Sequence, residues 1–197
     1  MRSRKAIYVI GLAVLTILFL HVFRSIYFPT YWIPTGGMEP TICGQTIDRT
    51  SRAITRSGVR IMINRLTYKF KDLVRGDIIV FRYPDKKETN PPMDFVKRLI
   101  GLPNDSVKIA SGELLINGEK ITEPYIMEPT SKDYEAVVSE GNVFVLGDNR
   151  NNNADSLLWG FLPIENIKGR VFFRYFPFSR FGFIERQPMT LANETDH

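Results

Sequence analysis

The stretch Ala6–Phe23 constrains this chain more than any other feature, because it is apolar apart from Thr16 and His21. As an α-helix rising roughly 1.5 Å per residue, it is about 27 Å long, which is enough to cross the hydrocarbon core of a bilayer. The sequence therefore predicts a transmembrane anchor over residues 6–23.

Charges beside this stretch predict which way the anchor crosses the membrane. The basic residues that flank it are Arg2, Arg4 and Lys5 before it and Arg24 after it. Basic residues favour the cytoplasmic side, so we expect residues 1–5 in the cytoplasm and residues 24–197 outside. A cleaved secretory signal has the same order of charged and apolar residues, but residues 21–28 offer no small-residue cleavage site.

Composition narrows the classes of function. A chain of 197 residues suits one anchor and one domain, and its net charge of +5 suits nucleic acid and an anionic membrane surface equally well. No RNP motif, zinc-finger spacing or Walker loop is present, so we expect membrane lipid and not nucleic acid as a partner. Cys43 is the only cysteine, and His21 and His197 are the only histidines. We therefore expect no disulfide, no metal site and no histidine-based catalytic triad.

A polar, basic stretch lies between Cys43 and Val59, and two interpretations of it stay open. Its arginines and the next one along the chain are Arg49, Arg52, Arg56 and Arg60. This spacing would place them on one face of a helix, where they could bind anionic lipid headgroups. The alternative is a solvated loop.

From Val59 onward the pattern favours β-structure: short runs of branched and aromatic residues are separated by Gly, Pro and Asp. The predicted strands are Val59–Ile63, Asp77–Tyr83, Phe95–Ile100, Ser106–Ile109, Glu113–Ile116, Glu119–Ile121, Val143–Leu146 and Val171–Phe176. Asn117-Gly118 is a strong hairpin signal, and Asp85–Asp94 is predicted to be a loop. We expect a mainly antiparallel β domain after the anchor.

The decapeptide Ile33–Ile42 reads Ile-Pro-Thr-Gly-Gly-Met-Glu-Pro-Thr-Ile. Its prolines favour extended backbone, and the pair Gly36-Gly37 permits close backbone approach, so a shaped loop is predicted. The aromatic residues Tyr31 and Trp32 come just before it and favour a membrane interface. We therefore expect this loop to lie close to the outer leaflet.

Four segments, in their order along the chain, resemble the type I signal peptidase family. They are Pro34–Ile42, Arg75–Phe81, Phe95–Asp105 and Gly147–Ser156. Each alone is a weak signal, but together and after an anchor they span nearly the whole chain and are highly specific. The resemblance implies a membrane-bound endopeptidase that removes signal peptides from exported preproteins at the outer face of the membrane. It also implies a serine/lysine mechanism without a cofactor, and a small second β subdomain within residues 102–141.

The resemblance implies that Lys97 is the general base. A lysine can accept a proton near neutrality only if its pKa falls well below about 10.4, which requires burial. Apolar residues surround Lys97 in the sequence, and on a strand Phe95 and Leu99 would share its face. The alternative is an exposed strand lysine beside Arg98.

The first motif departs from the family at its most important position. The family's serine nucleophile falls at Gly37, and its oxyanion-stabilising hydroxyl falls at Thr35. The backbone N–H of Gly37 could still donate to an oxyanion, but glycine has no atom that can attack a carbonyl. Met38, Pro40 and Thr41 match the family and are expected to shape the loop.

The last motif also departs. The family's serine beside the lysine falls at Asn153, and its arginine falls at Leu157. Asp155 matches the family aspartate but has lost this arginine partner, for which Arg150 is a candidate replacement. The residues that match, and that we expect to form a positioning turn, are Gly147, Asp148, Asn149 and Arg150.

These departures leave several hypotheses open. In the first hypothesis, the chain is a processing protease whose nucleophile has moved to Thr35, about 6 to 7 Å away along a strand. In the second, it keeps the fold and peptide groove without appreciable hydrolysis, and binds signal peptides or surface-protein precursors uncut. A third hypothesis is descent from an active enzyme through the change at Gly37, with the other departures tolerated. A purely structural membrane-anchored β protein would instead leave Lys97 exposed with an ordinary pKa.

Overall fold

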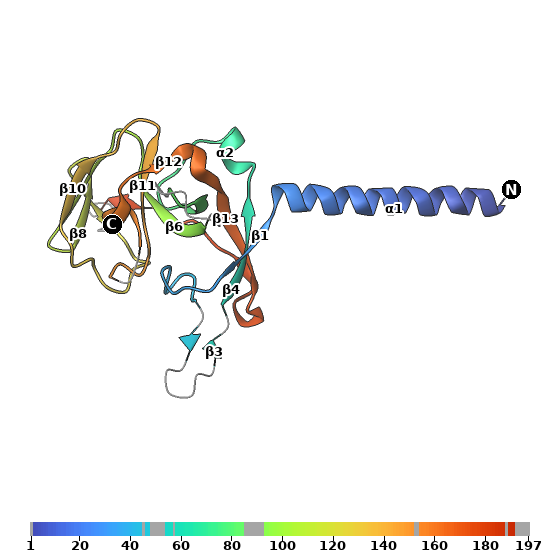
Figure 1. Cartoon of the computed structure of the whole chain (residues 1–197), viewed down its shortest axis with the longest axis horizontal. Helices are drawn as coiled ribbons and strands as arrows, with labels where there is room; N and C mark the ends of the chain where they lie inside the picture. The colour runs from blue at the N-terminus through green and yellow to red at the C-terminus, as the bar shows by residue number, and fades with distance from the viewer. Residues whose placement is uncertain are drawn as a thin grey trace.

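In the computed structural model of this chain, a long helix, α1, projects from a β domain, which is attached to the C-terminal end of the helix (Figure 1). The structure describes residues 2–44, 46–47, 54–56, 58–84, 93–151, 154–187 and 189–191. The side chains of residues 2–7, 46–47, 54–56 and 190–191 are not part of that description.

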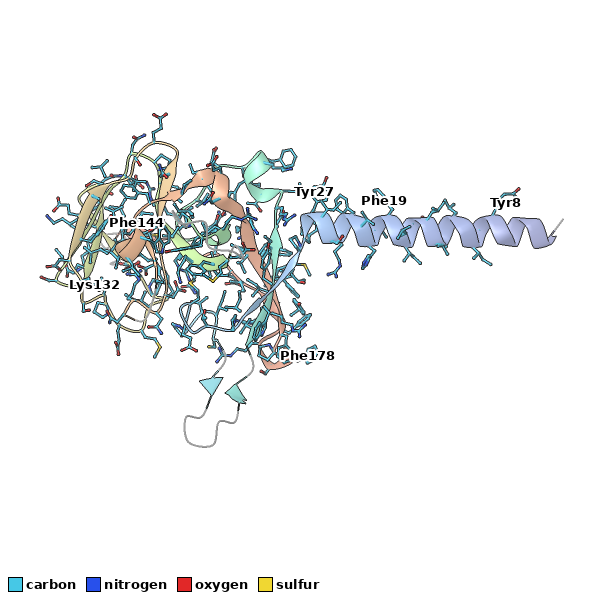
Figure 2. The ribbon with its side chains drawn as sticks, viewed as in Figure 1. Tyr8, Phe19, Tyr27, Lys132, Phe144 and Phe178 are labelled. Carbon is cyan, nitrogen blue, oxygen red and sulfur yellow. The ribbon has the colours of Figure 1, made fainter. Side chains whose placement is uncertain are left out.

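Helix α1 spans Arg2–Tyr27 and contains the predicted anchor. Its segment Tyr8–Tyr27 has a mean hydropathy of 2.2 and is not buried against the β domain, so by length and composition it can cross a membrane. Figure 2 shows the side chains of Tyr8 and Phe19 pointing outward from the helix, away from the β domain. The helix ends where Pro29 restricts the residue before it to extended geometry.

Eight of the described strands form one antiparallel sheet. Its order is β1 (Thr30–Ile33), β4 (Val59–Asn64), β13 (Ile167–Phe176), β5 (Ile78–Arg82), β6 (Asp94–Gly101), β11 (Asn142–Leu146) and β12 (Leu162–Pro163), with β14 (Gly182–Phe183) paired to β13. Two apolar clusters fill its faces, one around Ile61 and Val80 and the other around Phe81 and Leu99. The four motif segments therefore lie together in one domain.

A second antiparallel sheet packs around a third apolar cluster that includes Ile109 and Phe144. Its order is β10 (Tyr134–Val137), β7 (Ser106–Ala110), β8 (Glu113–Ile116), β9 (Glu119–Thr122) and β15 (Thr190–Leu191). Strands β2 (Thr46–Ile47) and β3 (Ile54–Arg56) pair with each other. The short helices are α2 (Thr67–Phe70), α3 (Ser156–Trp159), η1 (Ile164–Asn166) and η2 (Phe178–Arg180).

The eight predicted strands are all present, most with longer bounds, and β5 is one residue shorter at each end than the predicted Asp77–Tyr83. The hairpin at Asn117-Gly118 is confirmed, because both residues have positive φ, 54° and 84°, as a two-residue type I′ turn requires. The predicted loop Asp85–Asp94 is wrong at its end, since β6 begins at Asp94. Residues 85–92 lie outside the described part of the chain.

A helix that carries the arginines of the basic stretch is not found in the described residues. Ile54–Arg56 is a strand, and Arg60 belongs to β4. The extended backbone at Arg56 and Arg60 excludes a single helix that runs through both residues. Arg49 and Arg52 lie outside the described residues.

Candidate active site

A cleft of about 590 Å³ lies between the end of β1 and the first half of β6. Its lining comes from three of the four motif segments and from the residues just before them: Trp32, Ile33, Pro34, Thr35, Gly36, Gly37, Met38, Met93, Asp94, Phe95, Val96, Lys97 and Ala154. The structure therefore brings Thr35, Gly37 and Lys97 to the same cleft, although they are far apart in the sequence.

Hydrogen bonds hold the loop Gly36-Gly37 in place from two directions. Within the loop, the Glu39 N–H donates to the Gly36 carbonyl at 3.0 Å. From the last motif, Asn149 donates its side-chain Nδ2 to the Gly36 carbonyl and its backbone N–H to the Gly37 carbonyl, each at 3.3 Å. A Cβ at Gly44 would overlap the backbone of Thr35, so this glycine lets the chain return directly against the loop.

The residues of the loop differ in exposure. Met38 is buried and packs in the core with Ile33, Ile42 and Val96, so it fastens the loop to the sheet. Gly37 is also buried, whereas Thr35 is exposed at the cleft wall.

Lys97 is buried, with 7% of its surface exposed, as its apolar neighbours predict. Burial lowers the pKa of Lys97 to about 8, and the nearby carboxylates of Asp155 and Asp148 partly oppose this by favouring the charged form. Its Nζ lies 5.7 Å from the centre of the Phe95 ring, in keeping with their shared face. The alternative of an exposed, ordinary lysine is wrong, and this amine is partly neutral near pH 8.

Arg98, the next residue on β6, is a buried link among three motif segments. It is 1% exposed and binds the Asp148 carboxylate through two hydrogen bonds, of 2.8 and 2.6 Å. It also donates to the Gly76 carbonyl at 2.8 Å, and its guanidinium lies 3.8 Å from the centre of the Tyr125 ring. Asp148 thus has a role in anchoring the last motif to β6.

Asp155 caps helix α3 and is 2% exposed. Its carboxylate accepts the backbone N–H groups of Gly147 at 3.2 Å and Leu157 at 3.1 Å, and burial raises its pKa. Arg150 is not its ion-pair partner, because the Arg150 guanidinium pairs with Glu123. Two backbone donors therefore satisfy the Asp155 carboxylate, and a motif made of side chains could not reveal them.

Asn153 lies outside the described residues, so its expected place beside Lys97 stays a prediction. The next described residue, Ala154, is exposed and lines the cleft.

Two strand edges beside the cleft have no neighbouring strand in the described part of the chain. On β6, the pairing with β11 covers residues 98–101 and does not extend to Phe95 and Val96, which line the cleft. At the border of the sheet, β1 pairs with β4 alone. Open edges of this kind offer backbone N–H and C=O groups to an extended peptide.

Sequence reasoning did not single out Arg98 or Asn149 for these roles. The signal for Arg98 is a second cation inside an apolar strand, directly after Lys97 and facing the opposite side. Asn149 was expected only to form a turn, and its bonds to Gly36 and Gly37 join residues more than a hundred positions apart.

Comparisons with known proteins identify the family of this chain. The family model described as signal peptidase, peptidase S26, matches residues 4–176. A probable signal peptidase I-2 from Synechocystis is 39% identical over 155 residues, covering 78% of this chain and 65% of the relative. The signal peptidase I of Bacillus caldolyticus is 34% identical over 197 residues, covering 92% of this chain and 95% of the relative.

A crystal structure of a signal peptidase I from Enterococcus faecalis is 32% identical and matches 51% of this chain and 97% of its own, with a TM-score of 0.45. The family model covers most of the chain, and the Bacillus caldolyticus relative is matched over nearly its whole length. The chain belongs to the signal peptidase I family, peptidase S26.

Proposed function

We propose that this chain binds the signal peptides of preproteins in the cleft and holds them without rapid cleavage. The observation that carries the proposal is the cleft itself, where the Gly37 loop, the buried Lys97 and the open edge of β6 meet. An extended peptide would add to that edge through backbone hydrogen bonds, which need no nucleophile. Surface-protein precursors with similar segments are a related class of partner.

By the motif resemblance, Gly37 occupies the position of the nucleophilic serine. Lys97 occupies the general-base position, and its pKa of about 8 suits that task. Gly37 itself offers no hydroxyl from which Lys97 can take a proton, so an acyl-enzyme cannot form at this position. The exposed Thr35 hydroxyl lines the cleft and can donate to a carbonyl oxygen there.

The supporting residues keep this geometry whether or not the chain cleaves. Met38 fastens the loop to the core, and Asp148 joins the last motif to β6 through Arg98. Gly147 and Asp155 bind each other and fix the segment that leads to the cleft. Asn153 is assigned by resemblance to the position that contacts the lysine.

A second candidate function is slow cleavage with Thr35 as the nucleophile. The observation that favours it is that Thr35 is exposed and lines the same cleft as Lys97. The family geometry would then have to tolerate a displacement of about 6 to 7 Å along the chain. Loss of any cleavage in Thr35→Val would identify this route.

The helix α1 would hold the cleft at the membrane surface, where signal peptides emerge. We infer that residues 1–5 are cytoplasmic and that the β domain faces outward, because Arg2, Arg4 and Lys5 precede the apolar stretch. Accessibility of cysteines introduced at Ser3 and Lys132 to a membrane-impermeant thiol reagent, in a Cys43→Ser background, tests this orientation.

The proposal is tested by the binding of a synthetic signal peptide to the full chain in phosphatidylcholine nanodiscs. Met93 lines the cleft and is 50% exposed, so Met93→Glu puts a charge at the cleft mouth without disturbing the core. We expect Met93→Glu to weaken binding about tenfold. The matched control, Met127→Glu, alters a methionine that is 75% exposed outside the cleft and should leave binding unchanged.

Two results would contradict the proposal. The first is an absence of binding to the native chain at millimolar peptide. The second is an equal loss of binding in Met93→Glu and Met127→Glu, since the peptide would then not occupy the cleft.

A further inference from the structure

A second cavity, of about 750 Å³, lies at the foot of the membrane helix and does not include the cleft. It is lined by the last two residues of α1, by the segment from Arg65 to Leu73 that contains α2, and by the chain around the start of β13. In Figure 1, α2 and the start of β13 lie on the side of the domain that faces α1.

Hydrogen bonds to backbone carbonyls of residues 26–29 fix this cavity to the anchor. The Arg65 N–H donates to the Tyr27 carbonyl at 3.0 Å, and the Arg65 guanidinium donates to the Ile26 carbonyl at 3.3 Å. The Ile63 N–H donates to the Pro29 carbonyl at 3.1 Å. Because Tyr27 also ends the apolar segment, the cavity is held at the depth of the lipid headgroups.

The rim of the cavity is cationic. Four basic residues line it, Arg65, Lys69, Lys71 and Lys168, against two acidic ones, Asp72 and Glu165. Lys168 is paired with Asp94 at 2.6 Å. Lys69 and Lys71 are exposed and make no ion pair with any described residue, so their charges are available to a ligand.

The floor of the cavity is apolar, and a hydrogen bond to a buried carboxylate fixes one of its walls. Leu73, Leu102, Ile164 and Ile167 contribute aliphatic surface to it. The Tyr68 hydroxyl donates to the buried Asp77 carboxylate at 3.0 Å, which fixes one wall. A cationic rim above an apolar floor matches a molecule that has an anionic head and a hydrocarbon body.

We propose that this cavity binds the phosphate headgroup of an anionic phosphoglycerolipid from the leaflet that surrounds α1. The phosphate lies between Arg65, Lys69 and Lys71, and the glycerol with the first methylenes of its chains packs on the apolar floor. The exposed apolar surface of α1 beside the cavity carries the rest of the chains. The site holds the β domain at a set angle to the membrane, and it operates whether or not the cleft binds signal peptides.

The test is the lipid selectivity of the full chain in phosphatidylcholine nanodiscs that contain a small share of spin-labelled lipid. We expect the native chain to prefer spin-labelled phosphatidylglycerol over spin-labelled phosphatidylcholine. Lys69→Gln/Lys71→Gln should lower this preference about fivefold for each lysine, as for cations at an anionic bilayer surface. Lys69→Arg/Lys71→Arg should retain it.

The matched control removes two charges elsewhere. Arg24→Gln/Lys132→Gln deletes one cation at the end of α1, outside the cavity, and one on the far side of the domain, where Figure 2 labels Lys132. Its preference should stay within about twofold of the native value.

Three outcomes would overturn the proposal. One is no preference for phosphatidylglycerol in the native chain. Another is an equal fall of this preference in Lys69→Gln/Lys71→Gln and in Arg24→Gln/Lys132→Gln, which would indicate diffuse attraction to the bilayer. The third is loss of the preference in millimolar inorganic phosphate at constant ionic strength, which would make free phosphate the ligand. Peptide binding is measured in a separate experiment, so the outcome of the lipid experiment does not depend on the proposed function.

Discussion

The burial of Lys97 predicts a specific dependence of stability on pH, which the substitution Lys97→Met reveals. In the folded protein the pKa of Lys97 is lowered to about 8, from an ordinary value of 10.5, because the charged form is poorly solvated. Between these two values the unfolded chain binds more protons than the folded one. Stability therefore rises with pH through this window, and the cost of the buried charge is fully present below pH 8.

The size of the effect follows from that difference. Integrating proton binding from about pH 7 to about pH 9.5 gives a gain of about 2 kcal/mol in the free energy of unfolding of the native chain. Methionine has a similar volume and no charge, so Lys97→Met lacks this gain and should be more stable than the native chain at neutral pH. The advantage of Lys97→Met should shrink by about 2 kcal/mol as the pH rises through the same window.

The assay is denaturant unfolding of the full chain in detergent micelles, with the native protein and Lys97→Met compared at each pH. Taking the difference between the two proteins cancels the titration of all other groups. Lys120→Met, at a lysine whose side chain is 53% exposed, is the matched control and should show no such change. A difference between native chain and Lys97→Met that stays constant across the window would refute the argument, because Lys97 would then titrate normally and provide no base.

Further predictions concern the supporting structure and the chemistry. Asp148→Asn should cost roughly 3 to 5 kcal/mol, because it leaves Arg98 charged and buried; Arg98→Met/Asp148→Leu should cost much less, and denaturant midpoints compare the two. Asn117→Ala should cost roughly 1 to 2 kcal/mol in the same assay through its positive φ and lost side-chain bonds, whereas Asn117→Gly loses only the bonds. In Gly37→Ser, the cleavage rate should rise with pH and level off above a pKa of about 8, and a profile flat from neutral pH would exclude Lys97 as the base.

Local patterns in the sequence were sufficient for the anchor and for most of the large sheet. Short runs of branched and aromatic residues predicted β4, β5 and β6, because one or both faces of these strands are buried. The pattern failed for β1 and β10, whose burial is only partial and whose residues therefore lack a clear apolar alternation. It also failed for β15, two residues whose pairing with β9 depends on the folded domain.

In the candidate site, too, some residues could be predicted from the sequence and others could not. The motifs indicated Lys97 and Gly37, and the apolar neighbours of Lys97 predicted its burial. The partners of Asp155 could not be predicted, because backbone N–H groups are present at every position and carry no side-chain signal. The same holds for Asn149, whose contacts with Gly37 depend on how two distant loops meet.

We propose that the cleft keeps the geometry for signal-peptide processing and that Gly37 withholds the nucleophile. The most direct measurement is cleavage of a preprotein by the native chain, by Gly37→Ser and by Gly37→Ser/Lys97→Met, all in the same nanodiscs. We expect no rapid cleavage by the native chain, cleavage by Gly37→Ser, and loss of that cleavage in the double variant. Native cleavage as fast as that of Gly37→Ser would overturn the assignment of Gly37, and cleavage by Gly37→Ser that survives the loss of Lys97 would overturn the assignment of Lys97.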